Sequence, residues 1–113
     1  MMGERYATDE LVRDITRRIV EFCRPEKVVL FGSLARGEAK DHSDIDLFVI
    51  WDAAPDLSNR QRRVAIRRAI GALRAPLDLL TLTPSEVEEA TKDPRSFTSQ
   101  IMQEGRTLYE RFH

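Results

Sequence analysis

Two aspartates stand at alternate positions in the stretch SDIDLFVIW, residues 43–51. Side chains two apart in a β-strand point to the same face, so Asp44 and Asp46 would lie about 6.5–7 Å apart at their backbones. Two carboxylates this close repel each other unless a cation lies between them, and Mg²⁺ prefers such oxygen ligands together with substrate phosphates. Solvated aspartates at a strand end would give the same spacing. However, the residues after Asp46 are apolar on both faces, which indicates a strand that enters the core with the acids at its rim.

A third acid, Asp78, stands within the apolar segment LDLLTL. An unpaired buried carboxylate is unfavourable, so Asp78 needs a partner. If its strand lies beside that of Asp46, the three carboxylates form a cluster of the kind that holds two divalent ions and polarises phosphates. The alternative is an edge-strand aspartate that faces water.

A Gly-Ser turn precedes these acids. The segment GSLARGEA, residues 32–39, has the glycine spacing of a Walker loop, but Glu38 and Ala39 replace the required Lys and Ser or Thr. The glycine pattern of a dinucleotide-binding loop is also absent, because Leu34 stands in place of its second glycine. We expect a strand that ends at Gly32, where a ligand can approach the backbone, and Ser33 as the cap of a short helix whose free amides receive phosphate oxygens.

Basic side chains give weaker signals. Arg36 could bind a phosphate through its planar guanidinium, or be an exposed helix residue. His42 is more typical of a surface residue than of a ligand. Several arginines share one side of a predicted helix, and they form either a solvated face or a docking surface for an acidic partner or RNA. These are Arg60, Arg63, Arg67 and Arg74, with Arg68 near the edge.

Hydrophobic periodicity predicts the elements that position these residues. Apolar positions three and four apart predict helices, and short β-branched runs predict strands. The expected elements, in chain order, are a helix over 9–24 ended by Pro25, strands over 27–31, 43–51 and 75–83, a long helix over 56–74 capped by Asp56 or Ser58, a helix opened by Thr83, Pro84 and Glu86, a helix over 97–105 stopped by Gly105, and a last strand RTLYE.

Composition sets the remaining limits. A chain of 113 residues is about one domain, and we expect a single domain over 1–113. The 18 basic and 19 acidic residues and the 42% apolar content indicate a globular protein rather than a basic nucleic-acid binder or a disordered chain. No apolar run reaches the ~20 residues that span a bilayer, and the single Cys23 fits a reduced buried thiol, so we expect a cytoplasmic protein.

Gly32-Ser33, ten further residues and then Asp44-Ile45-Asp46 resemble the signature of the minimal nucleotidyltransferases, small relatives of DNA polymerase β. The resemblance includes Ser43, Asp78 and the closing IMQEGRTLYE, and covers nearly the whole chain. It implies an α+β fold with a small mixed β-sheet flanked by helices.

The resemblance also implies a chemistry. Gly32 and Ser33 would contact the triphosphate of ATP or another NTP, with Arg36 and Ser43 nearby, while Asp44, Asp46 and Asp78 would be catalytic and bind two Mg²⁺ ions. Stand-alone domains of this kind resemble antitoxins that pair with a HEPN-domain ribonuclease toxin, and the resemblance implies transfer of AMP to that toxin. The alternative is a non-catalytic binding module that neutralises its partner by contact alone. Three intact acids favour the enzyme, because a remnant has no reason to keep like charges together.

Overall fold

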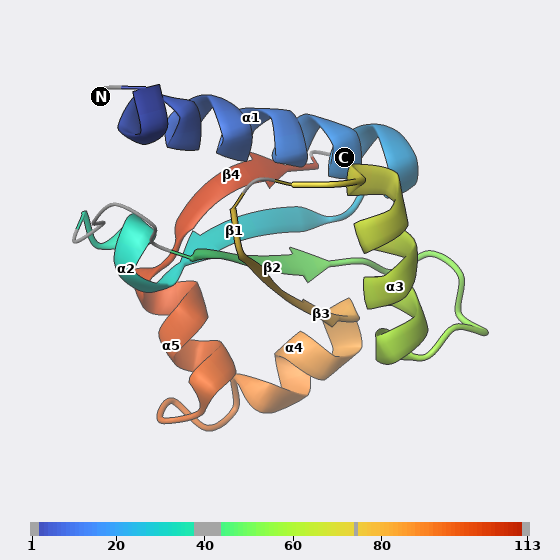
Figure 1. Ribbon diagram of the computed structural model, residues 1–113. Coiled ribbons are helices and arrows are strands. Elements are labelled where there is room, and N and C mark those ends of the chain that lie inside the picture. Colours follow the sequence, from blue (N-terminus) through green and yellow to red (C-terminus); the bar gives the residue numbers. More distant parts are fainter. Residues whose placement is uncertain (1–2, 38–43, 74, 112–113) are drawn as a thin grey trace.

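The computed structural model describes residues 3–37, 44–73 and 75–111, and within them a four-stranded sheet carries helices on both faces (Figure 1). None of the helices in these ranges is long and apolar enough to cross a membrane. The elements are α1 (Gly3–Cys23), β1 (Lys27–Phe31), α2 (Gly32–Ala35), β2 (Ile45–Ile50), α3 (Asn59–Ile70), β3 (Leu77–Leu82), α4 (Pro84–Ala90), α5 (Phe97–Glu104) and β4 (Arg106–Glu110).

The strand order is β3-β2-β1-β4. β1 pairs with β2 and with β4 in antiparallel fashion, whereas β2 and β3 are parallel. Parallel neighbours need a crossover connection, and α3 provides it. The predicted α+β fold with a mixed sheet is confirmed, and β2 and β3 are neighbours as the interpretation of Asp78 requires.

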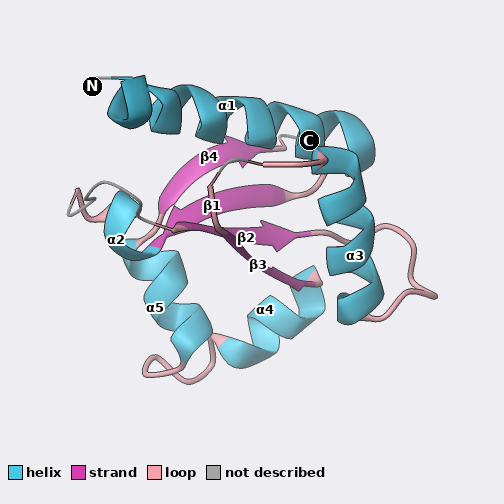
Figure 2. Ribbon diagram, viewed as in Figure 1, coloured by secondary structure: helices cyan, strands magenta, loops and turns pink. Residues whose placement is uncertain are grey.

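The two faces of the sheet are covered differently (Figure 2). α1 and α3 cover one face and enclose the larger apolar core, to which Ile15, Ile19, Leu47 and Ile66 contribute fully buried side chains. The opposite face carries a smaller cluster of Val29, Phe48, Ile50 and Ile101, against which α4 and α5 pack. Since side chains alternate along a strand, the even-numbered residues of β2 and β3, including both acids, lie on this second face.

Helix ends follow local chemistry. Ser58 and Thr83 each form a reciprocal capping box, with Gln61 and with Glu86, and Asn59 donates to the Glu86 carboxylate, which ties the starts of α3 and α4 together. The expected cap at Thr83 is confirmed, and Ser58 rather than Asp56 caps α3.

Two predicted helix boundaries are wrong. α1 begins at Gly3, earlier than the expected start at Asp9. α3 ends at Ile70 instead of continuing to Arg74, because Gly71 adopts a positive φ of 82°, which glycine alone reaches without strain. Arg74 lies outside the described residues, and the expected row of arginines along α3 therefore ends at Arg68.

One arginine of α3 is part of the protein interior. Arg62 is 4% exposed, and its guanidinium donates to the Asn59 side chain and to the Ala54 carbonyl, both at 3.0 Å. Buried charge is tolerated only with such partners. Arg62 therefore fixes the loop before α3 instead of contributing to a surface.

Candidate active site

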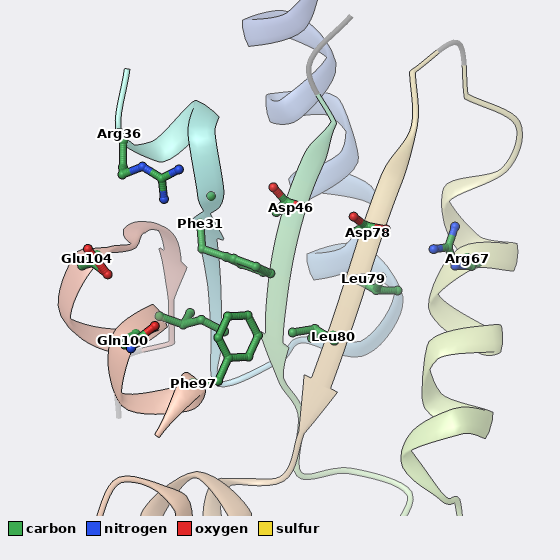
Figure 3. Close-up of a pocket in the computed structure, with 12 residues that line it drawn as sticks. Phe31, Arg36, Asp46, Arg67, Asp78, Leu79, Leu80, Phe97, Gln100 and Glu104 are labelled. Atoms are coloured by element: carbon green, nitrogen blue, oxygen red, sulfur yellow. The ribbon is translucent and has the colours of Figure 1, made fainter. Parts of the chain in front are cut away.

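The parallel register of β2 and β3 brings the two central acids together. Asp46 lies opposite Asp78, on the face of the sheet that α5 only partly covers (Figure 3). In the antiparallel register with β1, Phe31 lies opposite Asp46, so the end of β1 and the following turn reach the same place. Three strands thus converge on the Asp46 carboxylate.

The electrostatics of this pair are unfavourable for two ionised groups. The pKa of Asp46 rises from 3.8 to about 6, first because burial penalises its charge, and then because of the hydrogen bond to Asp78 and the negative charges of Asp78 and Asp44. Arg36 opposes this and lowers the pKa. Asp46 therefore binds a proton more readily than an ordinary aspartate.

Gly32 allows the Asp46 carboxylate to occupy its position. Its φ is +75°, and a Cβ at this residue would lie 2.2 Å from Asp46 Oδ2. Any side chain would collide with the carboxylate and be strained in its backbone. The glycine at the end of β1 is thus explained by contact with an acid as well as by its backbone conformation.

A cavity of about 520 Å³ lies in front of the acids. Arg36 and Arg67 line it with them, and they flank the acid pair on opposite sides in Figure 3. Arg67 is held by a 2.7 Å hydrogen bond to the Leu77 carbonyl, one residue before Asp78. Positive groups around a carboxylate pair suit a ligand that brings both cations and phosphate oxygens. The full lining is Phe31, Gly32, Arg36, Asp46, Arg67, Asp78, Leu79, Leu80, Phe97, Gln100, Ile101 and Glu104.

Other predicted site residues lie elsewhere. Asp44 directly precedes β2, is exposed and does not line the cavity. Ser33 lies inside α2 and is not its cap, since the helix begins at Gly32 with Phe31 in the cap position and no side-chain capping bond. Asp78 is exposed rather than buried, because β3 is an edge strand. Ser43 and His42 lie outside the described residues.

Sequence reasoning missed the side chains at the far end of the cavity. Phe97, Gln100 and Glu104 of α5 line it, and their spacing places them on one face of a helix. The pattern was available in the sequence, but an ordinary amphipathic helix gives the same spacing. Arg67 was expected only in a surface row, because its contact with β3 depends on tertiary packing.

The donor chemistry at Asp46 and Asp78 fits Mg²⁺. Their carboxylate oxygens are the ligands that this ion prefers, and a cation between them would relieve the repulsion that raises the pKa of Asp46. Among the residues that the structure describes, no three His, Cys, Asp or Glu side chains lie close enough to hold one ion. Asp44 therefore does not join the pair in this arrangement.

Solved structures with the same arrangement of strands and helices define the class of this fold. One is the crystal structure of a putative nucleotidyltransferase from Sulfolobus solfataricus, with a TM-score of 0.68, 20% identity, and coverage of 98% of this chain and 94% of that chain. Another is a toxin-antitoxin structure with AMP-PNP, with a TM-score of 0.57, 24% identity, and coverage of 88% and 73%. The fold is that of the nucleotidyltransferases.

Sequence comparison identifies the family. The model of the family described as polymerase beta, nucleotidyltransferase matches residues 13–113. The chain therefore belongs to the polymerase β-like nucleotidyltransferase family, as the Gly-Ser and Asp-x-Asp pattern predicts.

Three proteins of Methanocaldococcus jannaschii, each named Putative protein adenylyltransferase, are similar in sequence. One is 29% identical over 112 residues, 96% of this chain and 100% of its own length. A second is 38% identical over 47 residues, 42% of this chain and 55% of its own. The third is 29% identical over 59 residues, 50% of this chain and 60% of its own. The match thus spans little more than half the length of two of these relatives.

Proposed function

We propose that this chain is a magnesium-dependent enzyme that transfers AMP from ATP to a hydroxyl group of a macromolecule. The observation that carries the proposal is the pairing of Asp46 with Asp78 across β2 and β3, directly beside Gly32. Family membership and the name of the full-length relative, a protein adenylyltransferase, support the same reaction.

The proposed roles follow from position and charge. Asp46 and Asp78 would hold magnesium, and Asp44, which directly precedes β2, would have to move toward the pair to help hold a second ion. The ions, when bound, would polarise the phosphates and the acceptor hydroxyl. Arg36 would neutralise phosphate oxygens, and Gly32, Ser33 and Ser43 would lie along the triphosphate. The acceptor oxygen forms a bond to the α-phosphorus, the bond between the α-phosphorus and its bridging oxygen breaks, pyrophosphate leaves, and the hydroxyl proton passes to solvent.

The acceptor in this proposal is a partner protein, a HEPN-type toxin, with this chain as its antitoxin. Two observations support a docked partner: a similar fold occurs in a toxin-antitoxin structure with AMP-PNP, and exposed arginines lie on α3 beside the edge strand that carries Asp78. The surface is smaller than the sequence predicts. Its described part comprises Arg60 and Arg68, with the half-exposed Arg63, because Arg74 lies outside the described residues and Arg67 lines the cavity.

The competing function is neutralisation of the partner by contact alone. Such a module has no use for two adjacent carboxylates that raise the pKa of one of them, and this unfavourable pair is the observation that favours catalysis. The two functions differ in whether the partner gains the mass of AMP.

The test is the double variant Asp44→Asn with Asp46→Asn. We expect it to abolish magnesium-dependent transfer of labelled AMP to the co-purified partner and to retain the fold, since amides remove repulsion without changing shape. Asp9→Asn with Asp56→Asn is the matched control, because it removes the same charge at two exposed positions outside the cavity. Full transfer by the first variant would contradict the assignment. A partner that is inhibited by the wild-type chain without any mass increase would favour the binding module.

A further inference from the structure

Phe97 is a large apolar side chain in an unusual position. It is 59% exposed, although it begins α5 and lines the same cavity as the two acids. Exposed phenyl rings in a cavity beside charged groups are typical of ligand sites, where a few polar groups accompany an apolar wall. A ligand that fits this cavity would therefore have one flat, apolar part and one anionic part.

Phe31 connects the Phe97 ring with the acids. Phe31 is paired with Asp46 across β1 and β2, which places their Cβ atoms about 5 Å apart. The Phe31 and Phe97 rings meet edge to face, with centroids 5.9 Å apart. The Phe97 ring thus lies beside the aromatic residue that neighbours Asp46, on the face of the sheet that also carries Leu80 (Figure 3).

The start of α5, which carries this ring, is held by part-buried hydrogen bonds. Ser96 caps α5 by accepting from the Ser99 amide and donates to the Ala90 carbonyl, while the buried Ser99 hydroxyl donates to the Asp93 carbonyl at 2.7 Å. At the other end of α5, a Cβ on Gly105 would lie 2.4 Å from Val29 Cγ1, so the helix packs closely on β1. Both ends of the helix that carries the exposed phenyl ring are therefore held in place.

We propose that Phe97 and Gln100, with Glu104, form the base-binding part of the nucleotide site and that they favour adenine over uracil. This inference rests on the proposed function and names the substrate of the same site. Every base can stack on an aromatic ring, and a purine covers more of it than a pyrimidine does. The polar edge is then read by side chains one turn further along α5.

Gln100 and Glu104 supply a matching hydrogen-bond pattern. Both line the cavity on the same face of α5 as Phe97. A glutamine amide offers one acceptor and one donor group, which pair with the amino group and the ring nitrogen of adenine. The Glu104 carboxylate accepts hydrogen bonds, and so it suits a base with an exocyclic amino group. Uracil has no such group.

The experiment separates the base from the phosphates. Calorimetry in Mg²⁺ would compare ATP, UTP and inorganic triphosphate as ligands of the wild-type chain and of single variants. We expect Phe97→Ala to weaken the affinity for ATP about tenfold and to leave the affinity for triphosphate unchanged. Gln100→Ala should bring the affinities for ATP and UTP closer together. Phe22→Ala is the matched control, because Phe22 is 47% exposed and contacts Trp51, away from the cavity.

The outcomes distinguish this inference from the proposed function. Wild-type ATP affinity in Phe97→Ala would overturn the base site and leave the transferase intact. If that variant kept ATP binding and lost only modification of the docked partner, the ring would serve the acceptor, which also overturns the inference. Equal losses for ATP and triphosphate would show a disturbed phosphate site and reject the assignment of Phe97 to the base. A wild-type chain that binds neither ligand would reject both proposals.

Discussion

Replacing Asp46 by asparagine should stabilise the protein at neutral pH when divalent cations are removed. The folded chain holds the Asp46 proton with a pKa of about 6, against 3.8 for an ordinary aspartate. As pH rises above about 4, the unfolded chain loses this proton first, so the free energy of unfolding falls until the pH exceeds about 6. Asparagine resembles the protonated acid at every pH, so the free energy of unfolding of the variant does not fall in this way.

The size of the effect follows from the pKa difference. A shift from 3.8 to about 6 corresponds to about 3 kcal/mol if it is realised in full. The carboxylate is only half-buried, and solvent screens it, so we expect about 1 kcal/mol at pH 7. For a chain of this size, that is a rise in Tm of about 4 °C.

Urea unfolding of both proteins with a chelator, at pH 4.5 and at pH 7, would measure this difference in the free energy of unfolding. The stability gain of Asp46→Asn over the wild type should be larger at pH 7. Asp14 and Glu86 have lowered pKa values, because of hydrogen bonds from Arg17 and from the Thr83 backbone, and their contributions are lost as pH falls. The wild type and Asp46→Asn share those contributions, so they cancel in the difference between the two free energies of unfolding. Asp44→Asn, which changes an exposed residue, should gain less stability at pH 7 than Asp46→Asn. Destabilisation by Asp46→Asn at pH 7, or a gain independent of pH, would refute the reasoning.

Two further substitutions test the site and its support. Gly32→Ala should cost more stability than Gly37→Ala and should impair nucleotide binding. Both glycines have a positive φ, but only a Cβ at Gly32 would meet Asp46. Equal losses of stability in urea unfolding would contradict this. Arg62→Ala should lower the free energy of unfolding by about 2–3 kcal/mol, since it leaves buried acceptors unpaired, while Arg62→Met should cost less; calorimetric ATP affinity should be unchanged in both.

Local patterns were sufficient to predict most of the fold. The four strands of the described sheet were all expected from the sequence, and Thr83 with Pro84 and Glu86 predicted the start of α4. Such signals depend on neighbouring residues alone. The expectation that Asp78 would lie beside the strand of Asp46 is confirmed by the register. The catalytic and metal roles of these residues stay predictions.

Features that depend on distant segments were not predictable. Arg62 looks like its exposed neighbours in the sequence, and only the Ala54 carbonyl and the Asn59 side chain explain its burial. The expected capping role of Ser33 was wrong because α2 begins at Gly32 and Phe31 takes the cap position. Phe97 was expected as an ordinary helix residue, since its position in a cavity follows from how α5 packs on β1.

The hydrogen bond from Arg67 to Leu77 also protects the molecule from association. β3 is an edge strand, and in its parallel ladder the backbone of Leu77 faces away from β2. An open strand edge can recruit a strand from a second molecule, which leads to intermolecular sheets. The guanidinium already occupies the Leu77 carbonyl and places a charge there. The same side chain thus lines the cavity and removes one acceptor from the neighbouring sheet edge, which makes pairing with a second strand less favourable there.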